Sequence, residues 1–568
     1  MDFHYIEPEN TSPSESDQDA RVVVGIDFGT TFSGFAYANK VNKNTIETHD
    51  TWPEQRGALK TPTALLYTED WKVHKWGVPA LAVRPKKKKG KGARNVDTKP
   101  VELFKLHLGD MKDVEKPSLP DGLDFRKAIT DYLAEFGKLM KETLLARWPG
   151  LDFHKQILKV ITVPAEFDDR AKYIMRACAH SAGLTDKVDS ELLEFTTEPE
   201  AAAIYCMKVL KQHNLRKGSS FMIVDCGGGT VDLTTRTLLN QDCLSEVTER
   251  TGEFCGGSYV DKEFVKYMRK LVGSEAIDKL EENNYSQLQY LVQEFSTQIK
   301  LQFTGEPAKF KSKELDIEDM CPALIQYVDE KTKTEMEKTE WLIELNYITV
   351  KIFFDTVVDK ILRLIRDQLN SSKKAISALF MVGGFSESPY VLRRVREEYG
   401  REVEIIAVPS EPIAAVVRGA VYYGLNMKTI QTRVLKRTYG IEIWEKARSW
   451  DPKERQNDRG VVKLFHKLAQ RGTEVAVDAK FLFECWPIYA EQTTVKFLIY
   501  TTTEDDGKYC DDPGMKLFGK LQIDLPDPHL GRNRPIDFTL TFGKMETKAI
   551  ATNKRTGERC EAIFALEL

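Results

Sequence analysis

The sequence has few cysteines, and none is placed beside another in a way that binds a metal. Its 568 residues include 9 cysteines, an odd number, and no Cys-x-x-Cys pair occurs. Disulfide-rich secreted proteins and structural zinc sites both depend on closely spaced cysteine pairs. The pattern therefore favours a reducing compartment, predicts a cytoplasmic protein and argues against a metal site built from cysteines.

The sequence also lacks a strong charge of one sign and any long apolar run. The formal net charge is only -4, from 82 basic and 86 acidic residues, so general affinity for nucleic acid or for an anionic membrane is not expected. No stretch is apolar for long enough to cross a membrane. The first residues, Met1 to Asp19, have neither the basic start nor the apolar core of a signal peptide. Residues 1–20 are predicted to be a disordered tail.

One basic run is present, with Lys86, Lys87, Lys88, Lys89 and Lys91 interrupted by a single glycine. A solvated surface loop explains such a run, and so does a patch for an acidic partner or a nuclear-import signal. Access to the nucleus therefore stays open beside the cytoplasmic assignment.

The most informative feature present is a glycine and threonine turn that occurs twice, in residues 23–36 and again in residues 222–233. Each copy places an apolar β-rich run before an aspartate, then the turn, then a second β-rich run, which predicts a β-hairpin with a bare tip. Backbone N–H groups at a bare tip can approach an anion closely. The aspartates, Asp27 and Asp225, supply the hard oxygen that Mg²⁺ prefers. Two such tips predict two halves that close on a polyphosphate.

A shorter element also repeats, as EPEAAA in residues 198–203 and as EPIAA in residues 411–415. Proline pre-sets the first turn of a helix, and alanine extends the helix well. Because alanine also keeps a helix thin, two such helices are expected to cross closely. The order hairpin, helix, hairpin, helix predicts a duplicated α/β domain.

Four segments taken together resemble a known family. The two turns and the segment Leu379 to Ser386 resemble the phosphate-1, phosphate-2 and adenosine motifs of the actin-like ATPase superfamily. Residues 161–170 resemble the V-P-A-x-F segment of the heat-shock protein 70 chaperones, and Glu198-Pro199 follows at a similar distance. The adenosine motif reads G-G-F-S-E-S, which is similar to the divergent member 12-like branch of that family. The resemblance covers nearly the whole chain beyond the N-terminal tail.

The resemblance implies an α/β fold with a duplicated actin-like (ribonuclease H-like) two-lobed ATPase domain, followed by a C-terminal β-sandwich domain. Short β-like runs separated by turns, such as Asp505-Asp506-Gly507, also favour a β-sandwich for the C-terminal part. The sequence ends where the family's helical lid begins, so a domain without this lid is expected. The expected boundaries are 1–20 for the tail, 21–427 for the ATPase domain (lobe I about 21–215, lobe II about 216–427), 428–437 for the linker and 438–568 for the substrate-binding-like β domain.

The resemblance also implies roles for five charged residues. Asp27, Asp225 and Asp232 would hold Mg²⁺, largely through its waters, and would help to orient the attacking water. Glu198 would face the water shell of the metal, and Lys105 is the best match to the family's lysine near the transferring phosphate. Ordinary explanations exist for single residues. An aspartate beside glycine often only forms a turn, a glutamate favours a helix start, and Lys105 fits a plain surface lysine.

The expected cofactors are ATP or ADP and Mg²⁺. The adenosine end departs from the family, because Thr297, Leu301 and Glu387 stand where the family has a glutamate and two arginines. Stacking of adenine on a guanidinium is therefore not expected. The resemblance assigns cofactor binding to the following residues: Gly29, Thr30, Thr31, Phe32, Gly227, Gly228, Gly229, Thr230, Gly256, Gly257, Lys300, Gly383, Gly384 and Phe385.

The linker, residues 428–437, carries four basic residues, whereas the family's linker is apolar with acidic residues and docks as an extended strand. The spacing of Ile430 and Val434 would pair them on one face of a helix. Docking a basic linker is costly unless the docking site has changed its charge to match. Weak coupling between nucleotide and client is therefore expected.

Two main functions remain open at this point, and a third has less support. The resemblance implies a slow ATPase of the chaperone type, whose clients are unfolded or extended polypeptides and which a co-chaperone or exchange factor would assist. The changed adenosine end, the basic linker and the missing lid favour instead a nucleotide-dependent scaffold or signalling protein with little turnover. A sugar or acetate kinase on the same fold is the third reading, and the V-P-A-x-F segment argues against it.

Overall fold

The computed structural model describes residues 5–6, 20–43, 45–85, 99–209, 215–240, 243–477, 479–542 and 546–563. The predicted basic loop around Lys86 to Lys91 lies outside these residues. So does most of the predicted disordered tail, but Tyr5–Ile6 forms strand β1, so the prediction of disorder is wrong for these two residues. Among the helices of the described residues, none combines the length and the apolar composition needed to span a membrane.

The first large sheet has six strands, in the order β12, β11, β2, β3 and β4, with β7 beside β3. β3 runs antiparallel to β2, whereas β11 and β12 run parallel to it in turn. Every residue of β2 and β11 is buried, which explains their continuous apolar sequence. The strands are β2 (Val22–Phe28), β3 (Phe32–Asn39), β4 (Glu47–Thr48), β7 (Thr61–Pro62), β11 (Ile157–Val163) and β12 (Leu193–Thr197).

Helices α2 (Phe125–Arg147) and α3 (Asp169–Ser181) cover one face of this sheet. Apolar residues recur at helical spacing from Phe125 to Arg147, which predicts a helix with these bounds. Helix α2 confirms it, and its apolar face is buried, at Ile129, Leu133, Phe136, Met140 and Leu144. Asp124 caps its first turn, because its carboxylate accepts a hydrogen bond from the backbone N–H of Arg126.

The second large sheet repeats the strand arrangement of the first. β14 runs antiparallel to β13, β19 runs parallel to β13, and β20 runs parallel to β19. β15 forms one edge, and β16 also pairs with β14. The strands are β13 (Ser220–Cys226), β14 (Val231–Asn240), β15 (Cys243–Glu246), β16 (Thr251–Glu253), β19 (Ile376–Val382) and β20 (Ile405–Ala407).

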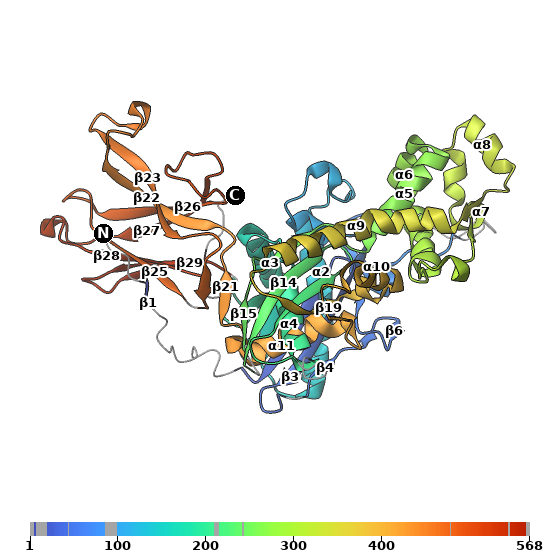
Figure 1. The fold of residues 1–568 in the computed structure, drawn as a ribbon, viewed down its shortest axis with the longest axis horizontal. Coiled ribbons are helices and arrows are strands. Elements are labelled where there is room, and N and C mark those ends of the chain that lie inside the picture. Colours follow the sequence, from blue (N-terminus) through green and yellow to red (C-terminus); the bar gives the residue numbers. More distant parts are fainter. Residues whose placement is uncertain are drawn as a thin grey trace.

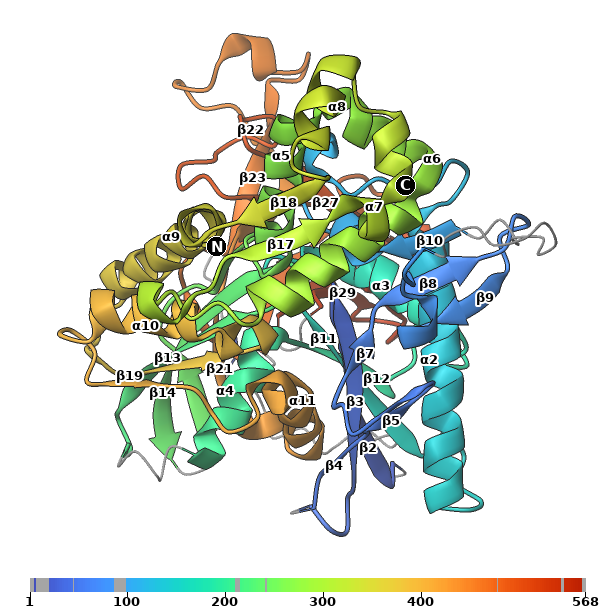
Figure 2. The same cartoon turned by 90° about the vertical axis from the view of Figure 1, so that its right-hand side faces the viewer.

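Two alanine-rich helices, α4 (Glu198–Val209) and α11 (Ala415–Leu425), lie between the two sheets (Figure 2). They share one buried core with strands of both sheets. A Cβ atom added to Gly419 of α11 would collide with the backbone carbonyl of Ala201 in α4. The prediction that these helices cross closely is therefore confirmed, and Gly419 allows the crossing.

The segment between the first hairpin and α2 is more ordered than the sequence suggests. Proline, glycine and a basic run predict an irregular segment over residues 51–113, but the described residues among them form short strands and the 3₁₀ helix η2, which carries Lys105. The elements are β5 (Thr51–Trp52), β6 (Gln55–Arg56), β8 (Ala64–Tyr67), β9 (Val73–Trp76), β10 (Lys99–Glu102) and η2 (Phe104–Leu108). β10, β8 and β9 form a three-stranded sheet in that order.

Apolar spacing predicts two further helices, over Tyr259 to Thr304 and over Leu342 to Leu369, and the structure differs from both predictions. The helix predicted over Tyr259 to Thr304 is interrupted at Gly273, whose φ of 93° only glycine adopts readily. In the second of these helices, residues Leu342–Leu345 form a strand instead. The helix therefore starts at Tyr347, where the Asn346 side chain caps it. The elements are α5 (Ser258–Val272), α6 (Ser274–Phe295), η5 (Ser296–Lys300), β17 (Lys313–Asp316), α7 (Ile317–Met320), α8 (Glu330–Glu337), β18 (Leu342–Leu345), α9 (Tyr347–Ser371), η8 (Gly384–Glu387) and α10 (Pro389–Tyr399).

The C-terminal part consists of two antiparallel sheets that share one core, which includes Ile441, Phe497 and Phe538. One sheet has the order β23, β22, β26, β27, and the other the order β1, β25, β28, β29, β30. Most short strands predicted here are present, although β22, β23 and β29 were not singled out. The strands are β22 (Thr438–Lys446), β23 (Val461–Ala469), β25 (Lys480–Cys485), β26 (Thr494–Thr502), β27 (Lys516–Asp524), β28 (Ile536–Thr541), β29 (Lys548–Asn553) and β30 (Arg559–Ile563).

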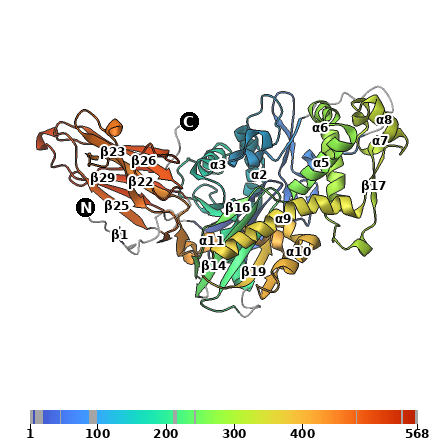
Figure 3. The same ribbon diagram turned by 45° about the horizontal axis from the view of Figure 1, so that its top comes forward.

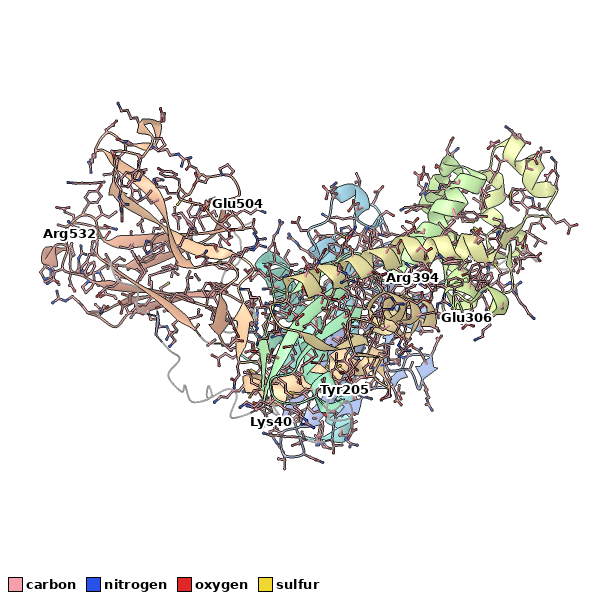
Figure 4. All side chains as sticks on the ribbon, viewed as in Figure 1. Lys40, Tyr205, Glu306, Arg394, Glu504 and Arg532 are labelled. Atoms are coloured by element: carbon pink, nitrogen blue, oxygen red, sulfur yellow. The ribbon has the colours of Figure 1, made fainter. Side chains whose placement is uncertain are left out.

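The molecule is elongated (Figure 1). The C-terminal sheets form one end, helices α5 to α8 form the other, and the two large sheets lie between them. Figure 3 shows the same three parts from another direction, with α9 running from the large sheets toward α5. In Figure 4, Arg532 and Glu504 mark the C-terminal end and Glu306 the opposite one.

The linker is docked and extended. Its residues Thr432–Val434 form β21, which pairs with β24 (Glu474–Ala476), so the helical pairing of Ile430 with Val434 is wrong. Acidic residues face its basic side chains, among them Glu200, which pairs with Arg433. The docking site therefore carries acidic groups that match the basic linker.

Candidate functional site

The tips of the two large hairpins meet. A Cβ atom added to Gly228 would collide with the Thr31 side chain, and one added to Gly229 would lie 2.5 Å from Thr30 Oγ1. Glycine is therefore required on the second tip because the threonines of the first tip approach it so closely. The structure thus brings together the two segments that the sequence suggested would close on a polyphosphate.

The start of helix α5 lines the second tip. Gly256, Gly257 and Ser258 donate backbone N–H groups to carbonyls of the second tip, at 2.8–3.1 Å. A Cβ atom on Gly256 would lie 2.6 Å from the carbonyl oxygen of Gly227. The predicted residues Gly256 and Gly257 are therefore part of the same assembly.

The predicted adenosine motif also reaches this place. Gly383, directly after β19, has a φ of 83°, and a Cβ atom added to it would collide with the carboxylate of Asp225. Phe385 lies against Gly257, with 3.2 Å between its ring and an added Cβ atom. Gly384 begins η8. Three motifs that lie far apart in the sequence therefore converge beside Asp225.

Two lysines form buried ion pairs with two of the predicted carboxylates. Lys105 lies 2.8 Å from Glu198, and its side chain is only 2% exposed, so its interpretation as a plain surface lysine is wrong. Lys60 lies 2.6 Å from Asp27. The rings of Phe28 and Phe167 flank the Lys105 ammonium at 5.7 and 5.6 Å. Each of these two carboxylates is therefore already paired with a cation.

Lys60 is the residue that sequence reasoning missed. It belongs to no motif, and it stands directly before β7, which pairs with β3 of the first hairpin. A lysine inside the segment Ala58-Leu59-Lys60-Thr61-Pro62 is the only signal, and the pairing of β7 with β3 is needed to see where that lysine points.

The remaining carboxylates lack cations. Burial raises the pKa of Asp225 well above its usual range, and the charges of Glu198, Asp232 and Asp27 raise it further. Burial raises the pKa of Asp232 to about 7, and the negative charge of Glu198 is the second cause of this rise. The pKa of Glu198 is also raised by burial, although Lys105 opposes this. Four carboxylates crowd around two ammonium groups, so the cluster is short of positive charge.

Asp232 is held from one side only. The backbone N–H of Ala165, in the V-P-A-x-F segment, donates to Asp232 Oδ1 at 2.6 Å. The other oxygen, Oδ2, is buried and has no hydrogen-bond partner among the described residues. A buried carboxylate oxygen without a partner is costly, and a cation or a water bound to a cation would satisfy it.

Across the described residues, no three histidine, cysteine or acidic side chains converge closely enough to hold a metal ion directly. The carboxylates are electrostatic neighbours rather than a closed ligand set. Contact with a metal through its waters, as predicted from the sequence, is compatible with this spacing.

The far end of the site differs from the two tips. Lys300 Nζ lies 2.5 Å from Asp261 and 3.4 Å from the carbonyl oxygen of Gly257, so it is fixed beside α5. Leu301 is 67% exposed. Glu387 is exposed as well. Phe32, a predicted contact on the first tip, is 46% exposed.

Comparison with known proteins agrees with this geometry. The family model described as Hsp70 protein matches residues 152–459, more than half of the chain. Over 97% of this chain and 92% of the relative, the chain is 25% identical to "Heat shock 70 kDa protein 12A" of Mus musculus. It is 22% identical to "Heat shock 70 kDa protein 12B" of Homo sapiens, over 98% of this chain and 92% of the relative.

A bacterial relative is similar over a shorter span. "Chaperone protein HscA homolog" of Chromobacterium violaceum is 24% identical over 67% of this chain and 55% of the relative. The 12A and 12B proteins thus match nearly from end to end, which the bacterial chaperone does not. The chain belongs to the heat-shock protein 70 family, with its actin-like ATPase fold, and is a divergent member similar to the 12A and 12B proteins.

Proposed function

We propose that this chain binds ATP and Mg²⁺ between two lobes of a duplicated ATPase domain and hydrolyses the ATP slowly. Family membership implies nucleotide binding. The repeated strand order of the two large sheets supports the duplication. The observation that carries the proposal is the meeting of the two glycine tips beside four buried carboxylates and two lysines.

The residues present fit a magnesium nucleotide. The unpartnered Oδ2 of Asp232 and the raised pKa values of Asp225 and Asp232 show carboxylates that lack positive charge. Asp27, Asp225 and Asp232 would hold the metal, mainly through its waters. A bound Mg²⁺ supplies the charge that neutralises the phosphate oxygens.

The other groups have separate tasks in this proposal. The tip glycines and Thr30, Thr31 and Thr230 offer N–H and hydroxyl groups to phosphate oxygens. Lys105 would stabilise charge that develops on the transferring phosphate, and Glu198 keeps this ammonium in place at 2.8 Å. Lys60, which is paired with Asp27, would act beside it. Phosphoryl transfer needs little more than such positioning and charge.

The C-terminal sheets are the proposed client-binding domain. Their two antiparallel sheets share one core, as a β-sandwich does. Exposed aromatic side chains occur on their loops, including Trp450, Trp486 and Tyr489. Such side chains offer contact area to an extended apolar polypeptide.

A scaffold or signalling protein with little turnover is the second candidate. Two observations favour it. Asp27 is already paired with a buried lysine, and the exposed Leu301 and Glu387 leave the base without a guanidinium to stack on. Neither observation removes nucleotide binding, so the two candidates differ in turnover alone. A sugar or acetate kinase gains no support from the relatives described above.

Single-turnover hydrolysis of labelled ATP tests the proposal. We expect slow release of phosphate with Mg²⁺ and none with EDTA, while calorimetry shows nucleotide binding that depends on Mg²⁺. Binding without any hydrolysis, even with an unfolded client present, would establish the scaffold. Absence of nucleotide binding would remove both candidates.

A further inference from the structure

The linker strand β21 is held on both of its edges. On one side it pairs with β24, with Arg433 opposite Val475. On the other side it lies along β15 of the second large sheet (Figure 1), where Gln431 donates its N–H to the carbonyl of Leu244 at 3.0 Å. The backbone N–H of Val434 also donates to the Glu246 carboxylate at 2.6 Å. The linker therefore joins the second large sheet to the C-terminal sheets.

The side chain of Arg433 enters a buried cluster of charges. Its guanidinium donates to both oxygens of Glu200, at 3.0 and 3.3 Å. Glu200 also pairs with Arg236, and the side chains of both are 0% exposed. Glu246 and Arg250 complete the cluster. Five charged groups from α4, β14, β15, the loop after β15 and the linker thus meet away from water.

Undocking the linker would break this arrangement at several points. Arg433, itself 4% exposed, would leave Glu200 buried without its two-point partner. Ile430 and Val434, at 1% and 8% exposure, would be returned to water. The hydrogen bond from the Val434 N–H to the Glu246 carboxylate would be broken. Undocking would lose all of these contacts in a single step.

Magnitudes decide whether nucleotide binding could cause this step. Removing the sole partner of a buried ion pair shifts an equilibrium by about a hundredfold to several thousandfold. Glu200 keeps Arg236 and Arg250 when Arg433 leaves, so this range is the upper limit for the Arg433 contact. Coupling between two ligand sites is typically about 5- to 150-fold. Undocking loses this contact together with the burial of Ile430 and Val434 and the Val434–Glu246 hydrogen bond. The combined loss therefore matches or exceeds what a nucleotide normally supplies.

Two further contacts hold the C-terminal sheets against the large sheets. Arg176 of α3 donates to both carboxylate oxygens of Glu546, at 2.8 and 2.6 Å. Lys436 Nζ donates to the carbonyl of Ala165 at 2.9 Å. Helix α3 and the segment after β11, on the side of the first large sheet, thus also hold the C-terminal sheets and the linker.

We propose that the Arg433–Glu200 pair makes the linker a permanent strand of the nucleotide-binding part, so that the C-terminal sheets keep one position whichever nucleotide is bound. The proposal goes beyond the ATPase chemistry, because it concerns the linker in every state of the site. A chain built in this way presents a fixed surface rather than a cycle of docking and release.

Hydrogen exchange at the linker amides, followed by mass spectrometry on full-length protein, tests the proposal. We expect residues 430–435 to exchange at rates within about threefold of each other in the nucleotide-free, ADP and ATP states. Arg433→Ala should raise these rates by about a hundredfold in all three states. Arg437→Ala is the matched control, because Arg437 makes no ion pair among the described residues, and it should leave the rates unchanged.

Protection that appears only with ATP, or that differs by about tenfold or more between ATP and ADP, would overturn the proposal. Equal rates in Arg433→Ala and wild type would overturn the role of the ion pair. If Arg433→Ala does not fold, Arg433→Lys, which keeps the charge but loses the two-point contact, replaces it. Exchange in the nucleotide-free protein is informative even if the chain never hydrolyses ATP, so the two proposals fail separately.

Discussion

Two clusters of buried charge begin two residues apart on helix α4, and they are built in opposite ways. Around Glu198, four carboxylates face two lysines, and burial together with mutual repulsion raises the pKa values of Asp225, Asp232 and Glu198. Around Glu200, two glutamates face three arginines, and the arginines hold the pKa of Glu200 well below its usual range despite burial.

The difference distinguishes the cluster around Glu198, which belongs to the proposed nucleotide site, from the cluster around Glu200, which holds the linker. In the cluster around Glu200, both glutamates are paired with arginines of the chain itself, so these carboxylates do not lack a cation. The cluster around Glu198 is destabilised until a cation arrives, as is common where a site must bind one. Two buried glutamates in the same helix turn are therefore expected to differ in function, Glu198 in the proposed nucleotide site and Glu200 in holding the linker, because different charges face them.

The largest effect is expected from Asp225→Asn in the cluster around Glu198. ATP turnover should fall at least about a hundredfold, because the change removes charge stabilisation that acts in the transition state. The midpoint of thermal unfolding should stay equal or rise, since one of four crowded charges is gone. Single-turnover hydrolysis and a thermal melt measure the two effects.

Asp359→Asn is the control for this variant, because the Asp359 side chain is 63% exposed and pairs only with Arg394 among the described residues. It should leave turnover unchanged. Full activity of Asp225→Asn would contradict the assignment of the site.

In the cluster around Glu200, a substitution is expected to lower the stability of the fold. Glu200→Ala should lower the free energy of unfolding by about 3–5 kcal/mol, because it leaves buried arginines without their partner. Asp225→Asn, in the cluster around Glu198, should not lower it, because no ion pair holds Asp225 among the described residues. Urea unfolding of both variants measures the difference, and equal losses would show that the two clusters do not differ as described.

The two clusters should also respond to pH with opposite signs. A carboxyl group whose pKa is raised on folding stabilises the protein below its unfolded pKa, and this contribution is lost as pH rises through the folded pKa. Asp232, with a folded pKa of about 7, should therefore cost the metal-free protein about 3 kcal/mol between pH 5 and pH 8.

Glu200, whose pKa is depressed, contributes stability above its unfolded pKa and loses it as pH falls. Urea unfolding in EDTA at several pH values, with wild type, Asp232→Asn and Glu200→Gln, compares the two. Asp232→Asn should flatten the loss toward pH 8. A wild-type stability that rises from pH 5 to pH 8 by as much as the variant's would contradict the raised pKa.

A smaller effect is expected at the base end of the site. Wild type should discriminate weakly between ATP and GTP, because Leu301 offers no guanidinium. Leu301→Arg should raise the affinity for ATP relative to GTP by about fivefold, through stacking on the base. Calorimetry with both nucleotides measures the ratio. Gln302→Arg, at the neighbouring exposed position, is the control, and a strong adenine preference in wild type would contradict the prediction.

The smallest effect should be that of nucleotide on client binding. If the linker stays docked, the Kd of an extended apolar peptide should differ by less than about fivefold between ATP and ADP on Asp225→Asn. Peptide release should be fast in both states, because the proposed contact residues, such as Trp450 at 65% exposure, lie open to solvent. Weak binding of this kind appears mainly as a high off-rate. Fluorescence titration and stopped-flow release measure both. A change of about tenfold or more would contradict the fixed arrangement.

Local features of the fold were predictable from the sequence where one local signal decides them. Helical spacing of apolar residues marks helix α2, and strand β11 is a short apolar run, Ile157 to Val163, that ends before Pro164. The bare glycine tips were recognisable because glycine weakens a strand and has no other use there.

Features decided by distant partners were not predictable. The pairing of Lys60 with Asp27 spans 33 residues, and that of Arg433 with Glu200 spans 233. Spacing within the linker suggested a helix, but neighbouring strands on both sides impose an extended conformation. The sequence therefore indicated that the linker is basic, but not that Glu200 lies where Arg433 docks.

The position of β15 at the edge of its sheet has a consequence for synthesis. Its residue Glu246 is made 188 residues before Val434, which covers it. At about 5–20 residues per second, that edge stays open for roughly 10–40 s on a nascent chain. An open edge strand recruits other strands. A member of a chaperone family thus passes, while it is being translated, through a state in which it needs protection itself.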